Sequence, residues 1–239
     1  MARIESKTVF TIGLLMLLMA VPAFGASVNK SIRIGDGEEA DGATTVNGSI
    51  SVGEDALVTG GMRTVNGSIR VERGATVRDA RTVNGTIRLA EGVETRHLNT
   101  VNGAILLGAE GLVDGDVSAV NGSITLEEKA RVTGDIDNVN GKIFLDHAQA
   151  EGNIKTVSGD IRLRQAVVKG DLLIEKPGIW SSSSKKRKPR IIIGPGSRVE
   201  GTIDIEHEVE LFISDTAEIG DVKGVMSVDD ATRFSGEEP

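Results

Sequence analysis

Acidic and amide side chains recur at a nearly constant spacing in the middle of this 239-residue sequence, as Asp116, Asp135, Asn153 and Asp171. Two carboxylates held ~5–5.5 Å apart form the catalytic pair of retaining glycosidases, and rows of carboxylates also bind calcium. Any regular stack of chain segments brings equivalent residues this close, so the spacing by itself is not specific. We interpret these residues as solvated turn residues, with weak calcium binding and polysaccharide cleavage as the alternatives.

A basic segment is the second candidate for chemistry. Residues 175–190 read EKPGIWSSSSKKRKPR, which places five positive charges within six residues of an acidic chain. Lysine and arginine attract phosphate and uronate groups, and tryptophan settles at lipid interfaces. We therefore expect an anionic envelope lipid or polysaccharide as the partner, and a solvated loop is the alternative. The candidate ligand-binding residues are Trp180, Lys185, Lys186, Arg187, Lys188 and Arg190.

Other kinds of site find little support. The chain has no Cys, which excludes disulfides, thiolate metal sites, a cysteine nucleophile and a lipoprotein anchor. His97 and His147 occupy different places in the repeat described below, and His207 lies where the repeat is looser, so we expect no histidine metal site. Nucleophile-elbow, P-loop and dinucleotide motifs are absent, and we predict no catalytic residues and no cofactor. A net charge of −8 argues against nucleic acid as a partner.

A short repeat must position these residues. The motif Val-Asn-Gly-x-Ile begins at six valines, and Val157-Ser158-Gly159-Asp160-Ile161 is a variant of it. A degenerate copy begins at Val28, and successive copies are 18 or 19 residues apart. The six valines are Val46, Val65, Val83, Val101, Val120 and Val139.

The alternation within one repeat is that of a strand. Val83, Gly85, Ile87 and Leu89 form one series, which we expect to face inward, and polar residues lie between them. An interval of 18 residues is too short for a strand–helix–strand unit, which needs about 30. The sequence therefore predicts an all-β fold, a single-stranded parallel β-solenoid of about ten coils of 18–19 residues.

The Asn-Gly step is expected at a corner of each coil. We predict positive φ there, which glycine adopts freely and asparagine tolerates, and hydrogen bonds between stacked asparagines. The corner residues are Asn47, Gly48, Asn66, Gly67, Asn84, Gly85, Asn102, Gly103, Asn121, Gly122, Asn140 and Gly141.

The termini differ in composition from the repeat. Residues 1–25 read as a signal peptide, with Arg3 and Lys7 before an apolar run from Val9 to Val21 and cleavage after Gly25. A retained membrane anchor is the alternative, but this run is shorter than the ~20 residues that span a bilayer. We expect a solenoid domain over residues 26–228, interrupted by the basic insertion 175–190, and an acidic tail over 229–239. A cleaved signal peptide predicts a periplasmic, secreted or cell-surface location.

The repeated Val-Asn-Gly-x-Ile coils resemble bacterial adhesin-like families of unknown function and, more loosely, the polymer-forming bactofilins. The resemblance covers roughly residues 28–225. It implies a right-handed parallel β-helix with a structural or cell-surface role and no catalysis. Coil length alone is equally compatible with the left-handed hexapeptide helix. Bactofilins are typically cytoplasmic or membrane-associated, whereas this chain begins with a signal-like segment.

These observations predict a non-enzymatic structural or adhesin-like protein of the bacterial cell envelope, which docks to anionic surfaces through its basic loop. A polysaccharide-active solenoid enzyme and a filament-forming envelope scaffold remain alternatives. The filament would assemble by self-association through the coil ends.

Overall fold

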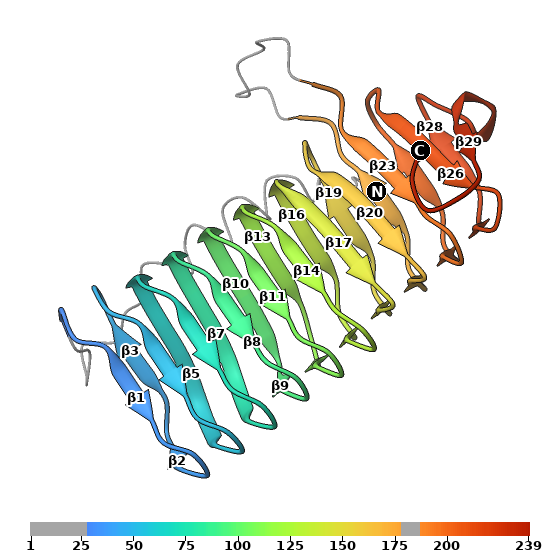
Figure 1. The fold of residues 1–239 in the computed structure, drawn as a ribbon. Coiled ribbons are helices and arrows are strands. Elements are labelled where there is room, and N and C mark those ends of the chain that lie inside the picture. Colours follow the sequence, from blue (N-terminus) through green and yellow to red (C-terminus); the bar gives the residue numbers. More distant parts are fainter. Residues whose placement is uncertain (1–27, 178–186) are drawn as a thin grey trace, which may run out of the picture.

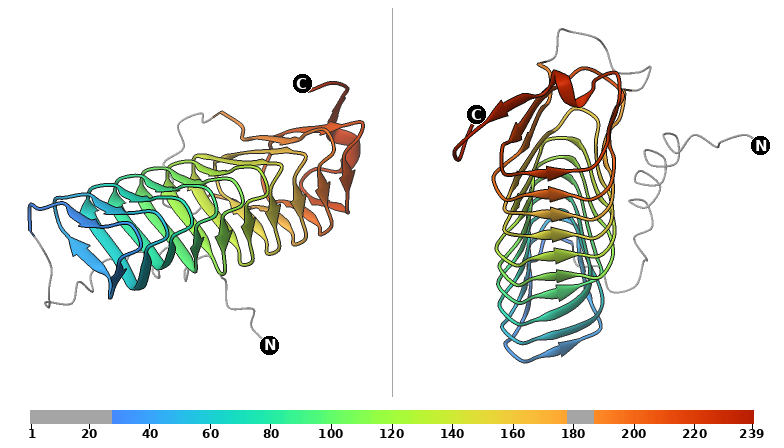
Figure 2. Two further views of the ribbon diagram at one scale, coloured as in Figure 1. Left: turned by 60° about the horizontal axis from the view of Figure 1, so that its bottom comes forward. Right: turned by 90° about the vertical axis from the view of Figure 1, so that its right-hand side faces the viewer.

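The computed structural model describes residues 28–177 and 187–239, which form one stack of about ten coils (Figure 1). Every strand pairs in parallel with its counterpart in the next coil, and the only helical element among the described residues is a single 3₁₀ turn. The predicted all-β parallel β-solenoid is confirmed. Figure 2 shows the coils lying one upon another along a rod.

One side of the rod is an 11-stranded sheet, to which each coil contributes one short strand. These strands are β1 (Ile32–Ile34), β4 (Ile50–Val52), β6 (Ile69–Val71), β8 (Ile87–Leu89), β11 (Ile105–Leu107), β14 (Ile124–Leu126), β17 (Lys142–Asp146), β20 (Asp160–Arg164), β23 (Arg190–Ile193), β26 (Glu210–Ser214) and β29 (Thr232–Phe234).

The rest of each coil belongs to an 18-stranded sheet, which bends around the rod. Its short strands are β2 (Glu39–Ala40), β9 (Glu94–Thr95), β12 (Leu112–Val113), β15 (Arg131–Val132), β18 (Gln149–Ala150), β21 (Val167–Val168), β24 (Arg198–Val199) and β27 (Glu218–Ile219). The strands that lead to the corner are β3 (Ala43–Thr45), β10 (His97–Asn102), β13 (Val117–Asn121), β16 (Ile136–Asn140), β19 (Ile154–Thr156), β22 (Leu172–Ile174), β25 (Ile203–Ile205) and β28 (Val222–Gly224). Two long strands, β5 (Leu57–Asn66) and β7 (Thr76–Asn84), cover both positions.

The core consists of ladders of identical or similar apolar side chains. Ile87 pairs with Ile69 on one side and Ile105 on the other, as predicted, and it is 0 % exposed. Leu89 continues the same inward series. Because every coil supplies one residue to each ladder, branched aliphatic side chains fill the interior without large aromatic rings.

The expectation that the motif valine faces inward is wrong. Val83 is half-buried on the outside, whereas Thr82 before it is buried. The inward alternation changes phase at the corner, because the Thr82 hydroxyl donates a hydrogen bond of 2.9 Å to the Gly67 carbonyl of the preceding coil. Thr64 and Thr100 make the equivalent bond to Gly48 and Gly85. This position therefore needs a hydrogen-bond donor more than it needs an apolar side chain.

The corner glycines are required for a reason other than the one predicted. Gly85 and most of its equivalents do not have positive φ, and only Gly141 in this series does, at 159°. A Cβ on Gly85 would instead lie 1.9 Å from the carbonyl oxygen of Gly67, and a Cβ on Gly67 would lie 1.9 Å from that of Gly48. Glycine is present because successive corners approach more closely than any side chain allows.

The corner asparagines form the predicted ladder. Each side-chain amide donates to the side-chain oxygen of the asparagine one coil earlier, with distances of 2.6–3.1 Å. The ladder runs through Asn29, Asn47, Asn66, Asn84, Asn102, Asn121 and Asn140. In-register amide stacking of this kind pins each coil to the next.

The C-terminal coils extend further than expected. Strands continue after residue 157, and Arg190, the last residue of the expected insertion, begins β23. The segment expected as a tail contains β29, which pairs with β26, and it follows a 3₁₀ turn, η1 (Val228–Asp230). Met226 and Ala231 pack against the core at this end of the rod.

Candidate functional site

A row of large outward side chains crosses the C-terminal half of the 11-stranded sheet. Phe144 of β17, Arg162 of β20, Ile192 of β23 and Phe212 of β26 are register partners in consecutive strands. Their neighbours along each strand point into the core, so the alternation of the strand forces these four outward. All four are half-buried, because each is flanked by the equivalent residue of the next coil.

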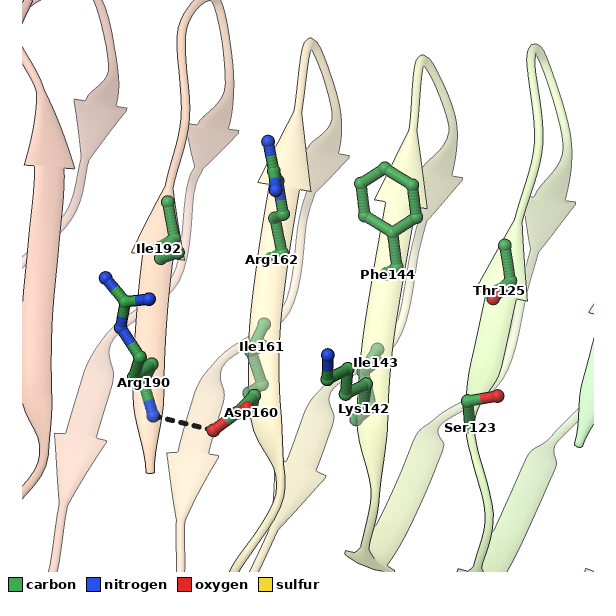
Figure 3. A pocket seen from close by; sticks show the side chains of 10 residues that line it. All are labelled: Ser123, Thr125, Lys142, Ile143, Phe144, Asp160, Ile161, Arg162, Arg190 and Ile192. Atoms are coloured by element: carbon green, nitrogen blue, oxygen red, sulfur yellow. Dashed lines mark hydrogen bonds between the residues drawn. The ribbon is translucent and has the colours of Figure 1, made fainter. Parts of the chain in front are cut away.

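A groove of about 400 Å³ lies along this row (Figure 3). Ser123 and Thr125 line it beside β14, Lys142 and Phe144 lie on β17, and Arg162 and Ile192 continue it toward the C-terminus. The volume falls within the range of small-molecule sites, which is ~300–1,000 Å³. The groove therefore combines two hydroxyl groups, three cations (Lys142, Arg162 and Arg190), the carboxylate of Asp160 and apolar side chains.

Three arginines of β20 and β23 lie close to aromatic rings. The guanidinium groups of Arg162 and Arg164 are each 5.7 Å from the ring centroid of Phe144, and that of Arg190 is 4.9 Å from the ring of Phe212. Contacts in this range are favourable cation–π interactions, and they hold the guanidinium groups against the sheet. No motif in the sequence connects these phenylalanines with the basic residues.

Carboxylates hold the described end of the basic segment to the rod. Asp160 accepts a hydrogen bond of 2.9 Å from the Arg190 backbone N–H and pairs with the Arg187 guanidinium at 2.6 Å. Lys188 pairs with Glu208 at 2.8 Å, which raises the pKa of Lys188 and lowers that of Glu208. These ion pairs are exposed, so each is weak and open to exchange with another anion.

The predicted ligand-binding residues divide into two groups. Arg187, Lys188 and Arg190 lie together at the start of β23, next to the groove. Trp180, Lys185 and Lys186 lie outside the described residues. Sequence reasoning missed Asp160, Glu208 and Glu210, which neutralise the first group from other coils. Their only sequence signal is their place in the repeat, and the insertion obscures it.

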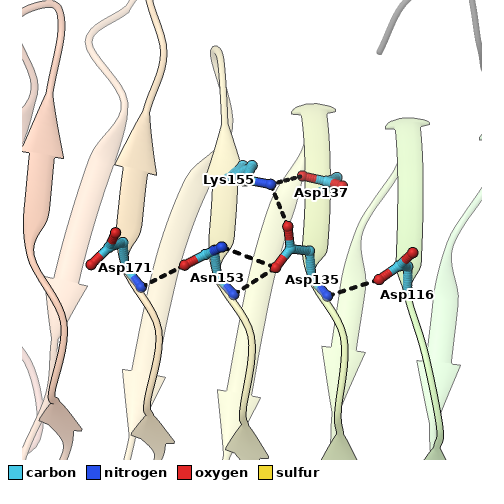
Figure 4. Close-up of polar contacts among 6 residues, drawn as sticks. All are labelled: Asp116, Asp135, Asp137, Asn153, Lys155 and Asp171. Carbon is cyan, nitrogen blue, oxygen red and sulfur yellow. Dashed lines mark hydrogen bonds and ion pairs between the residues drawn. The ribbon is translucent and has the colours of Figure 1, made fainter. Parts of the chain in front are cut away.

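The recurring acidic residues form a ladder on the other sheet (Figure 4). Asp116 accepts the backbone N–H of Asp135 at 3.0 Å, and Asp135 accepts that of Asn153 at 2.9 Å. Asn153 in turn accepts the N–H of Asp171, and Asp171 accepts that of Thr202. Each side chain thus satisfies a backbone donor of the next coil, which is a structural use of the predicted turn residues.

One carboxylate beside this ladder has a strongly shifted pKa. Burial raises the pKa of Asp137 to about 6, against the opposing charge of Lys155, whose ammonium lies 3.9 Å away. Lys155 also pairs with Asp135, and hydrogen bonds from Lys155 and Asn153 lower the pKa of Asp135 despite its partial burial. An acid with a raised pKa thus lies beside one with a lowered pKa.

Asp137 should make the rod less stable as the pH rises. Its pKa is above the ordinary 3.8, so the folded state binds the proton more tightly, and stability is lost as the pH rises from about 4 to about 6. Asp137→Asn should remove this decline and raise the free energy of unfolding at pH 7.5 by at most about 3 kcal/mol. Urea unfolding at pH 4.5 and pH 7.5 would measure it, with the exposed Glu127→Gln as the control. An Asn variant that follows the parent protein at both pH values would contradict the assignment.

The histidines are dispersed, as expected. His97 contacts Asp79 at 3.0 Å, His147 contacts Asp146 at 2.7 Å, and His207 contacts the Val157 carbonyl at 2.8 Å. Among the residues that the structure describes, no group of three or more His, Asp or Glu side chains could hold a metal ion. Over the same residues, no helix has the length and apolar character needed to cross a membrane.

Comparisons with protein-family models, with curated proteins and with solved structures found no match to this chain.

Proposed function

We propose that this protein is a non-enzymatic, adhesin-like rod of the bacterial cell envelope, which docks to an anionic surface through a basic patch. The patch comprises Arg187, Lys188 and Arg190 of the basic segment together with Arg162 and Arg164 on the adjacent strand β20. One observation carries the proposal: the fold places the described basic residues of this segment beside the cation-bearing groove. The signal-like residues 1–25 support a place outside the cytoplasm.

A basic patch on an acidic protein favours docking of an anionic surface at that patch over nonspecific attraction to the whole rod. The chain carries a net charge of −8, so a polyanion is repelled by most of the rod and is attracted only where cations cluster. The rod itself is stiff, because every coil is hydrogen-bonded to its neighbours along both sheets. A stiff rod with a cationic patch suits a structural or adhesive role.

Neutralising the basic segment should abolish docking without affecting the fold. Changing Lys185, Lys186, Arg187 and Lys188 together to Gln should weaken binding to anionic vesicles or acidic polysaccharide at least tenfold, since each exposed cation contributes up to about 1 kcal/mol. Binding by the parent should also fall with salt, which screens charges over about 8 Å at physiological ionic strength. Co-sedimentation at low and high salt measures both effects.

A matched control removes arginines elsewhere on the same sheet. Arg33, Arg70 and Arg88 are exposed on the first coils, so changing them to Gln should leave binding close to that of the parent.

Trp180→Ala should weaken vesicle binding more than polysaccharide binding, because an aromatic ring settles at the lipid interface. If the parent binds neither surface at low salt, the docking proposal fails.

Polysaccharide cleavage is the second candidate, favoured by the neighbouring Asp137 and Asp135. A protonated acid beside an ionised one is the arrangement that glycosidases use for acid and nucleophile. A glycan-cleavage screen of the parent and of Asp116→Asn, Asp135→Asn and Asp137→Asn would decide. Cleavage that disappears in these variants would replace the docking proposal with an enzymatic one.

A further inference from the structure

We propose that the groove on the 11-stranded sheet binds the carboxylate of a uronate sugar in an acidic polysaccharide, with Arg162 as its main contact. This inference rests on the docking function proposed above and assigns that function a site and a ligand class. It concerns the face formed by β14, β17, β20 and β23 (Figure 3).

Arg162 is built to hold a carboxylate. It lies in register between Phe144 and Ile192, so apolar side chains flank its guanidinium on both sides. Apolar flanks keep water away and strengthen an ion pair, and the planar guanidinium matches a carboxylate in geometry. A sugar ring also has apolar C–H surfaces, which Phe144 and Ile192 can cover while its acid group reaches Arg162.

A carboxylate already occupies this position. Glu238, the penultimate residue of the chain, pairs with Arg162 at 2.6 Å. Residues 235–239 are exposed, and Glu238 is held at Arg162 from 76 residues away in sequence. The contact with Glu238 thus shows that Arg162 can bind a carboxylate. The same contact means that Glu238 competes with an external ligand for Arg162.

The remaining groups of the groove suit an acidic sugar. Lys142 forms no ion pair with any residue that the structure describes, and the Ser123 and Thr125 hydroxyls lie beside it. The one acid in the groove, Asp160, is already paired with Arg187 and bonded to the Arg190 backbone. A ligand carboxylate would therefore meet Lys142 and, by displacing Glu238, Arg162, beside an acid that is already neutralised.

The shape of the site favours a polymer over a membrane. The groove crosses consecutive coils on the side of the rod, where a chain of sugars can lie along the row from Thr125 to Ile192. A lipid surface would contact projecting residues instead of side chains recessed in a sheet. Charge complementarity and the bound Glu238 thus point to a polyuronate.

The test compares polygalacturonate with neutral dextran and with vesicles that contain phosphatidylglycerol, by calorimetric titration at low salt. Arg162→Gln should weaken polygalacturonate binding about tenfold or more, which corresponds to losing one charge-assisted hydrogen bond. Glu238→Gln should strengthen it about two- to fivefold, because it removes an exposed competing ion pair. Arg88→Gln is the matched control, since Arg88 lies in the same outward row, three strands before Phe144. It should bind as the parent does.

Three outcomes would overturn the inference. If Arg162→Gln binds polygalacturonate as tightly as the parent while the basic-segment variant does not, the groove assignment is wrong and the docking proposal stands. If the parent binds vesicles but not polygalacturonate, the ligand is a lipid headgroup. If Glu238→Gln binds no more tightly than the parent, the tail does not occupy the site. Melting temperatures equal to that of the parent would show that each variant is folded.

Discussion

Alanine in place of Gly85 should lower the free energy of unfolding by about 3 kcal/mol, the upper part of the range for overpacking. The new Cβ would lie 1.9 Å from the Gly67 carbonyl oxygen and 2.5 Å from the carbonyl carbon. These are backbone atoms, and Gly67 is itself held by the Thr82 hydroxyl, so the clash is relieved only if two coils move apart. Chemical denaturation of the parent and the variant would measure the loss.

Further glycine variants identify the cause. Gly61→Ala should be nearly neutral, because the nearest atom to its Cβ lies at 3.9 Å. Gly85→Asn should be at least as harmful as Gly85→Ala, since the obstacle is steric and not a left-handed backbone. At Gly92, where φ is +67°, asparagine should be tolerated better than alanine. A Gly85→Ala variant as stable as Gly61→Ala would show that the corners can separate without cost.

Truncating Ile87 to alanine should cost about 2–5 kcal/mol through lost burial and the cavity that remains. Ile87 is 0 % exposed and is stacked between Ile69 and Ile105, which are 0 % and 1 % exposed. Neighbouring coils are fixed by the asparagine ladder and the strand pairing, so they cannot collapse into the space. Urea unfolding monitored by far-ultraviolet circular dichroism would measure the change.

The adjacent Arg88 provides the control. Its side chain is exposed on the outer face of β8, so Arg88→Ala should change the free energy of unfolding by less than about 0.5 kcal/mol. If Ile87→Ala is as stable as Arg88→Ala, the isoleucine ladder does not carry the stability of the core.

Much of the fold could be predicted from the sequence. The interval of 18 or 19 residues determines which residues stack, because only a coil of constant length returns the chain to the same place. The asparagine and isoleucine ladders follow directly, as the hydrogen bonds of Asn84 and the strand pairs of Ile87 show. The same periodicity located the acidic ladder, whose side chains bond to backbone donors of the next coil.

The repeat interval does not determine which side chains point inward at a corner or why glycine is needed there, and only the tertiary structure shows both. Periodicity identifies which residues stack in neighbouring coils, but it does not show whether a side chain near a corner points inward or outward. Val83 was expected inside but lies on the outside, and Thr82 is buried in its place. The corner glycines were expected to have positive φ, whereas the close contact between neighbouring coils is what requires glycine at these positions. Both depend on the distance between backbones in neighbouring coils, which no local pattern encodes.

The candidate groove could not be predicted from the sequence for a similar reason. Ile192 follows its partner Arg162 by 30 residues, because the insertion interrupts the interval, and Glu238 reaches Arg162 from outside the repeat altogether. The sequence by itself determined the stacked rod, its internal ladders and the existence of a basic segment. Only the tertiary structure brought Phe144, Arg162 and Ile192 into one row, since contacts across an insertion and from a tail depend on where the chain returns in space.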